Sequence, residues 1–162
     1  MKIKLLLFVI LMSTCAFSQS KFSVGVGSNQ QFLKSDNGLG FDAFVSYNVN
    51  ADIAIHITAS QANLNSKDFD IDYSMKKYSL TANYDFSKSE KSKLESVFGF
   101  SYLELDKKLL LDKRDGLGID LGIKATFGLK NNLNYGFKLV STYSDIAPGG
   151  LLAAGIFLKY DL

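Results

Sequence analysis

The stretch from Leu117 to Leu129, LGIDLGIKATFGL, decides the fold class. Its odd-numbered positions carry Leu, Ile, Leu, Ile, Ala, Phe and Leu, whereas its even-numbered positions carry Gly, Asp, Gly, Lys, Thr and Gly. Successive side chains of a β-strand point to opposite sides, so an apolar residue at every second position indicates a strand with one apolar and one polar face. The stretch therefore predicts a two-faced strand.

The same alternation recurs along the chain and predicts about eight strands, most of them about 9–11 residues long, which is the length a tilted strand needs to cross a bilayer. The parity of the apolar positions changes within Phe69–Lys77, which predicts a bulge or a loop there. The predicted strands are Phe22–Ser28, Leu39–Val49, Ala51–Ala59, Tyr78–Phe86, Leu94–Tyr102, Leu117–Leu129, Leu133–Tyr143 and Leu152–Leu162.

The predicted connections differ in length between the two ends of the strands. Short ones lie around Asn50, over Ser87–Lys93 and over Lys130–Asn132. Short turns on the periplasmic side and longer loops outside are typical of outer-membrane barrels. The opposite connections are predicted to be mostly longer, at Asn29–Gly38, Gln61–Lys77 and Leu103–Gly116, with a shorter one that contains Pro148 at Ser144–Gly150.

The N-terminus reads as a targeting segment. Lys2 and Lys4 precede the apolar run Leu5–Met12, and Ala16-Phe17-Ser18 has the small-x-small form that a signal peptidase cleaves. We expect a signal peptide over residues 1–18 and a barrel domain over 19–162. The only cysteine, Cys15, follows a loose lipoprotein-like box, so its lipidation stays open. The precursor has 18 Lys+Arg and 16 Asp+Glu; without the two signal lysines the counts are equal, so no charge excess favours nucleic acid.

Alternation alone does not separate a membrane barrel, whose apolar face points outward, from a soluble lipocalin-like barrel, whose apolar face points inward. Small residues dominate the polar face, and they suit the narrow interior of an eight-stranded barrel better than a solvated surface. Aromatic residues gather near both strand ends, as at lipid–water interfaces. The small residues are Gly25, Gly27, Gly40, Ser46, Ala54, Thr58, Gly99, Gly118, Gly122, Gly128, Gly136 and Gly155.

The C-terminus resembles the assembly signal of outer-membrane barrels, with Gly155 followed by Leu158, Tyr160 and Leu162 at alternating positions. Two positions depart from that signal: Ala153 stands where a polar residue is usual, and the last residue is Leu rather than Phe. Together with the targeting segment and the strand pattern, the chain resembles the OmpA/OmpX-like family of small eight-stranded barrels. The resemblance implies a closed antiparallel up-and-down transmembrane β-barrel in the outer membrane of a Gram-negative bacterium, assembled by the barrel-assembly machinery.

Charged residues on the polar face predict an ion-pair network that fills the lumen. If Lys130–Asn132 form the turn, Lys124 lies directly opposite Lys138, and their repulsion requires carboxylates nearby, with Glu95 and Asp120 as candidates. The predicted polar lumen residues are Asp42, His56, Glu95, Asp120, Lys124, Lys138 and Lys159.

Other motifs carry little chemistry. A lone His56 gives neither a metal site nor a triad, and we expect it to face Phe44 across a turn. Gly25 and Gly27, like Gly116 and Gly118, lack a following helix that a phosphate loop needs. The acidic loop with Asp68, Asp70 and Asp72 lacks the glycine and distal glutamate of a calcium loop. A basic loop contains Lys107, Lys108, Lys113 and Arg114 around the apolar tip Leu109–Leu111.

These observations predict a monomeric, non-enzymatic barrel without cofactor or metal. Its partners would be outer-membrane lipid and lipopolysaccharide, and its external loops would make surface contacts or stabilise the envelope. Three alternatives stay open: a transport barrel for small or hydrophobic molecules, a secreted lipocalin-like ligand-binding barrel, and an outer-membrane enzyme that depends on His56.

Overall fold

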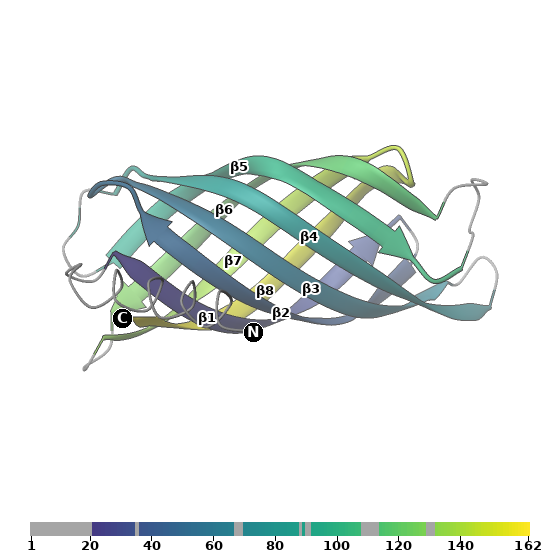
Figure 1. The fold of residues 1–162 in the computed structure, drawn as a ribbon. Coiled ribbons are helices and arrows are strands. Elements are labelled where there is room, and N and C mark those ends of the chain that lie inside the picture. Colours follow the sequence, from purple (N-terminus) through teal and green to yellow (C-terminus); the bar gives the residue numbers. More distant parts are fainter. Residues whose placement is uncertain are drawn as a thin grey trace, which may run out of the picture.

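The protein is a closed antiparallel β-barrel of eight strands (Figure 1). The computed structural model describes residues 21–34, 36–66, 70–87, 89, 92–107, 114–128 and 132–162, so the predicted signal peptide and Cys15 lie outside the described residues. Each strand pairs with its neighbours in sequence, and β1 pairs with β8 to close the barrel, which confirms the predicted fold class. The strands are β1 (Phe22–Leu33), β2 (Asp36–Asn48), β3 (Ile53–Ser66), β4 (Ile71–Asp85), β5 (Ser92–Leu105), β6 (Asp115–Gly128), β7 (Leu133–Ser144) and β8 (Ala147–Asp161).

β1 begins and β8 ends at the same end of the barrel, the left-hand end in Figure 1. This is the periplasmic end expected for an even number of strands. The predicted contrast in connection length is wrong. At the opposite, external end only residues 34–35 separate β1 from β2, and only residues 145–146 separate β7 from β8. Most residues predicted as external loops are strand, because the strands extend several residues beyond the predicted bounds.

The bulge or loop predicted before Tyr78 is also wrong. β3 and β4 pair without interruption from Ile53 opposite Tyr84 to Ser66 opposite Ile71. The register is irregular elsewhere, between Thr142 and Ser144 where β7 pairs with β8. A feature other than a shift in register must therefore explain the change in apolar parity along β4.

The outer face of the barrel is aliphatic, as a membrane barrel requires. Ile53, Ile55 and Ile123 are 38%, 40% and 51% exposed to the surroundings of the protein, whereas Lys124 is only 6% exposed. A soluble barrel would have the reverse arrangement. The secreted lipocalin-like alternative is therefore wrong. No helix among the described residues has enough apolar length to pass through a bilayer.

The polarity of the two faces inverts toward the external end, and this inversion accounts for the change in parity. On β4, Tyr78 points outward, but beyond it the outward residue is Lys76 and the inward residues are the buried Met75 and Tyr73. A buried apolar group, here called the external apolar cluster, fills the barrel at this level. Its members are Leu33, Ala62, Leu64, Tyr73, Met75, Leu103, Leu105, Ile146 and Leu151.

Over β3 and β4 the external section therefore has the arrangement of a soluble barrel, with an apolar interior and a polar exterior, whereas Phe32 of β1 and Leu152 of β8 are apolar and outward. On β3, outward Asn63 and Asn65 flank inward Leu64, which is 1% exposed. Since amide groups are costly to place in hydrocarbon, this part of β3 and β4 must project beyond the lipid tails. Outward Tyr78 and Tyr102, which are paired across β4 and β5, lie at the boundary between the two sections.

Candidate functional site

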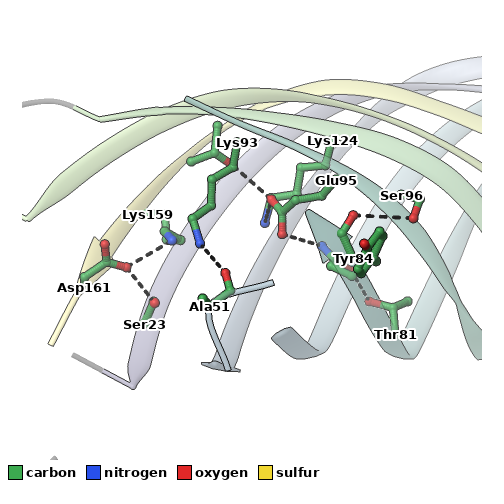
Figure 2. Close-up of polar contacts among 12 residues, drawn as sticks. Ser23, Ala51, Thr81, Tyr84, Lys93, Glu95, Ser96, Lys124, Lys159 and Asp161 are labelled. Atoms are coloured by element: carbon green, nitrogen blue, oxygen red, sulfur yellow. Dashed lines mark hydrogen bonds and ion pairs between the residues drawn. The ribbon is translucent and has the colours of Figure 1, made fainter. Parts of the chain in front are cut away.

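The lumen of the membrane-spanning section contains the charged residues, beginning with a pair on adjacent strands. Glu95 on β5 and Lys124 on β6 are direct register partners and are both buried. Their Oε2 and Nζ atoms are 3.8 Å apart, and Figure 2 shows the two side chains together inside the wall. Thr126 and Asn83 also donate to the Glu95 carboxylate, so protein donors replace the water that it loses on burial.

Lys138 lies directly opposite Lys124 in the register of β6 and β7. Its carboxylate partner is Asp42 on β2, with Nζ 2.6 Å from Oδ2, rather than Glu95 or Asp120. Asn29 on β1 donates from Nδ2 to the same Oδ2 atom at 2.7 Å. The pair joins strands that are not neighbours, so it crosses the lumen instead of following the wall.

Asp120 on β6 binds Lys77 on β4, which the sequence analysis placed in a loop. The Nζ–Oδ1 distance is 2.9 Å, and the side chains of Lys77 and Asp120 are 10% and 1% exposed. Thr142 and Ser101 donate to the same carboxylate oxygen at 2.6 and 3.1 Å. Because β4 and β6 are not neighbours in the sheet, the Lys77–Asp120 pair forms a second link across the interior.

Lys159 occupies the periplasmic mouth with Asp161 as its partner, at an Nζ–Oδ1 distance of 3.0 Å. Ser23 donates to Asp161 Oδ1 at 2.7 Å, and Asn134 donates to Oδ2 at 2.8 Å. Figure 2 shows Lys159 and Ser23 directed toward the same carboxylate. This cluster connects β8 to β1 and β7 where the barrel closes.

An aromatic layer crosses the lumen at the level of Lys124. The rings of Phe44 and Phe157 meet edge to face with centroids 5.8 Å apart, and Lys124 Nζ lies 5.2 and 4.7 Å from the two centroids. Gly25 makes room for this layer, since a Cβ there would lie 2.2 Å from Phe44 Cζ. Cation–π attraction and the Glu95 carboxylate together compensate the buried ammonium.

His56 belongs to the same layer, but the observed register of β2 and β3 differs by two residues from the predicted one, which placed His56 opposite Phe44. Its register partner is Ser46, and Thr58 is the partner of Phe44. The His56 and Phe44 rings still meet diagonally, with centroids 5.8 Å apart. His56 is 6% exposed, so the imidazole is enclosed in the lumen, where it lines two pockets.

A cavity of about 80 Å³ lies between the aromatic layer and the external apolar cluster. Asn29, Gln31 and Asp42 line one part of it, and Lys77, Ser79 and Thr81 line another. Sequence reasoning missed Gln31 and Asn29 because it ended the first strand at Ser28. Both residues are at odd-numbered positions, like Gly25 and Gly27, so continuing the strand would have placed their side chains in the lumen.

The last strand places the residues of the predicted assembly signal on two faces. Leu158, Tyr160 and Leu162 are exposed on the outer face, whereas Gly155 pairs with Asn29 of β1 and Lys138 of β7. Asp68 of the acidic loop and Lys108–Lys113 of the basic loop lie outside the described residues. Within the described part of the chain, no group of three or more His, Cys, Asp or Glu side chains is placed to hold a metal ion.

Comparisons with solved structures show the same fold. The Neisserial surface protein A structure matches with a TM-score of 0.63 at 12% identity, covering 88% of this chain and 97% of that one. The outer membrane protein Ail of Yersinia pestis in a phospholipid nanodisc matches with a TM-score of 0.57 at 20% identity, covering 88% of this chain and 100% of that one. The outer membrane enzyme PagL matches with a TM-score of 0.58 at 11% identity, covering 86% of this chain and 99% of that one. These identities show the fold alone, and the fold does not separate enzymes from other barrels.

No curated protein matches the chain. The family model of the outer membrane protein beta-barrel domain matches residues 5–157, which is most of the chain. That match agrees with the apolar outer face and the closed β-barrel. The chain belongs to the outer membrane protein beta-barrel domain family and resides in the outer membrane of a Gram-negative bacterium.

Proposed function

We propose that this protein is a non-enzymatic, non-conducting barrel whose projecting external end makes contacts at the cell surface or stabilises the envelope. The external apolar cluster is the observation that carries the proposal. Leu64, Leu103 and Leu151 in the cluster are at most 1% exposed, so packed hydrocarbon fills the lumen above the charged layer. An ion crossing this layer would lose most of its hydration, and the Tyr73 hydroxyl in the layer already donates to Asp36.

The outer surface of the projecting section supports the contact role. Outward Asn65 donates to Asp72, and outward Ser74 donates to Asn63, so amide, hydroxyl and carboxylate groups cover β3 and β4 just outside the lipid tails. We expect this surface to meet the polar part of lipopolysaccharide, with outer-membrane lipid around the barrel below. The outward Leu158 and Tyr160 of β8 favour recognition by the barrel-assembly machinery, and we expect a monomer.

The enzymatic alternative finds little support at His56. Its ring packs against Phe44, and its strand neighbour is Ser46. A general base must lie within hydrogen-bond reach of a nucleophile that substrate can approach, and a histidine enclosed in the lumen does not meet that requirement. We expect His56→Gln to alter stability and no catalytic rate.

A second candidate function, passage of small hydrophobic molecules through the wall, is favoured by one observation. The pairing of β7 with β8 is irregular between Thr142 and Ser144, and Gly149 and Gly150 on β8 have positive φ angles of 91° and 80°. Fewer regular ladder bonds hold the wall there, next to the upper part of the lumen. This is where a lateral opening would form.

Single-channel recording in planar bilayers tests the proposal. We expect no ion conductance from the wild-type barrel and from the outward control Glu104→Gln. Leu103→Ser, which places a hydroxyl in the apolar layer, should produce openings or raise leak. Steady wild-type conductance would contradict the proposal, and uptake of an apolar dye into vesicles by the wild type without ion conductance would favour the lateral route.

A further inference from the structure

We propose that a groove on the outer face of the wall is a binding site for one acyl chain of a phospholipid from the periplasmic leaflet. The groove has a volume of about 610 Å³ and is lined by residues of β7, β8, β1, β2 and β3. It crosses the pairing of β8 with β1 that closes the barrel. Because it is separate from the lumen and from the projecting external end, the inference goes beyond the proposed function.

The first side of the groove is a row of outward side chains that climbs from the periplasmic end. Each member is the register partner of the next: Leu133, Tyr160, Val24, Val45 and Ile57. They are the first residue of β7, the second from the end of β8, the third of β1, the fourth from the end of β2 and the fifth of β3. The row therefore starts at the periplasmic rim and moves steadily into the membrane, as strands inclined to the barrel axis require (Figure 1).

The second side of the groove is low, and this gives the groove its depth. Its register partners are Leu158, Val26, Ala43 and Ala59, so two of these four positions carry only a methyl group. Between the two sides lies Gly25, whose partners on β8 and β2 direct their side chains into the lumen. The floor of the groove is therefore backbone.

The dimensions of the groove match one hydrocarbon chain. From β7 to β3 it crosses four strand spacings of about 4.8 Å, which gives a length of about 19 Å. Successive outward residues of one strand are about 7 Å apart, which is too narrow for a helix about 10 Å across. Since the strands of such barrels tilt by about 35–45°, the groove rises by about 12 Å, within the roughly 15 Å of one leaflet.

The chemistry of the lining favours an acyl chain over a polypeptide. Among the residues of the two sides, Tyr160 carries the only polar group, and its position at the rim is one that tyrosine favours. A peptide in hydrocarbon needs partners for its amides, and the strands here use their own backbone groups in pairing with one another. The groove opens sideways to the lipid around the barrel, so a chain enters from the bilayer.

The position of the two ends assigns the lipid to the periplasmic leaflet. The groove starts where Leu133 begins β7, at the rim opposite the external end. It ends on β3 at Ala59, two residues before the outward polar Gln61, so its whole length lies in hydrocarbon. A phospholipid whose headgroup lies at the periplasmic rim can therefore lay one chain along it.

Another part of the wall shows how side chains otherwise fill such a space. On β5, the successive outward residues Phe98 and Phe100 have ring centroids 6.0 Å apart, so they leave no open strip comparable to that beside Ala43. A chain bound in the groove would contact both β8 and β1. We therefore expect the lipid to stabilise the closure of the barrel.

The test uses the folded barrel in nanodiscs that contain a small fraction of a phosphatidylethanolamine with a diazirine at the end of one acyl chain. Light couples the probe to the residues that it contacts, and peptide mass spectrometry locates them. We expect at least fivefold more labelling at Ile57 and Ala59 than at Phe98 and Phe100. A second probe, with the diazirine next to the ester, should label Leu133 instead.

Ala43→Phe fills the groove and should lower the labelling at Ile57 and Ala59 to the level of β5. Ala82→Phe is the matched control, because Ala82 is outward and exposed on β4 but does not line the groove. It should leave the labelling unchanged. Should Ala43→Phe fail to fold, Ala59→Leu takes its place, with Ile57 as the readout.

Three results would overturn the proposal. One is equal labelling of the groove and of β5 in the wild type. Another is unchanged labelling in a folded variant with a filled groove. The third is a groove shielded from both probes together with a dimer in native mass spectrometry, which would show that a second copy covers it.

Discussion

Replacing Leu103 by alanine tests whether the external apolar cluster is a packed core. Leu103 is 0% exposed, on the inward face of β5, and its neighbour Glu104 is exposed on the outward face. The substitution removes about three methylene-sized groups at about 0.8 kcal/mol each. A residual cavity adds to this, since buried Leu→Ala changes cost about 2–5 kcal/mol. We expect a loss of about 3 kcal/mol in the free energy of unfolding.

The assay is equilibrium unfolding in urea with the barrel in lipid vesicles. The chain contains no tryptophan, so far-UV circular dichroism and the folded band on an unboiled gel follow the transition. With a urea dependence of about 2 kcal/mol per molar, the midpoint should fall by about 1.5 M. Glu104→Ala is the control and should change the free energy of unfolding by less than about 0.5 kcal/mol. If both variants lose the same small amount, the external section is not a packed apolar core.

Two further substitutions test the lumen. Gly25→Ala should destabilise the barrel by about 1–3 kcal/mol, because the added Cβ would meet the Phe44 ring. Adding Phe44→Leu to the same chain should restore part of the lost stability. Equal losses with and without Phe44→Leu would contradict this contact. Asp120→Asn should cost about 3–5 kcal/mol by leaving the Lys77 ammonium without a charged partner, and the double variant Lys77→Met with Asp120→Asn should be more stable than the single one. Urea unfolding measures the second prediction as a double-mutant cycle, and additive losses would show that the pair does not interact.

The alternation of apolar residues was sufficient to predict the strand count and the antiparallel order, and the small residues on the polar face predicted which face meets lipid. Leu121 and Ile123 are outward because side chains alternate and the opposite face carries the small residues that a narrow lumen accommodates. The opposition of Lys124 and Lys138 followed from the length of one turn, which sets the register of a hairpin.

The external section could not be predicted in the same way, because there the environment changes while the strand continues. Beyond Lys76 on β4 the outside is water and the inside is hydrocarbon side chains, so the parity of the apolar positions inverts without a bulge. Sequence reasoning that assumes one environment per strand must read that inversion as a break. Because of this assumption, Lys77 was predicted to lie in a loop rather than in the lumen.

The partners of the lumen charges were predictable only where they are adjacent in the sheet. Glu95 and Lys124 follow from the register of β5 and β6. Asp42 and Lys138 meet across the lumen, and their meeting depends on how the barrel closes between β1 and β8, which no local pattern specifies. A long, flexible lysine side chain can also reach several carboxylates at similar distances, so the sequence does not specify which of them it pairs with.

The orientation of the wall and the height of the membrane boundary are the centre of this account, and spin-label accessibility measures both. Leu121→Cys and Asn63→Cys place one label on the aliphatic band and one on the projecting section, with Cys15→Ser added if residues 1–18 are retained. In nanodiscs, we predict that the label at position 121 collides with oxygen and is shielded from a water-soluble nickel chelate, and that the label at position 63 shows the opposite. The account would be contradicted if the label at position 121 were immobile and shielded from oxygen, or if the label at position 63 collided with oxygen and were shielded from the nickel chelate.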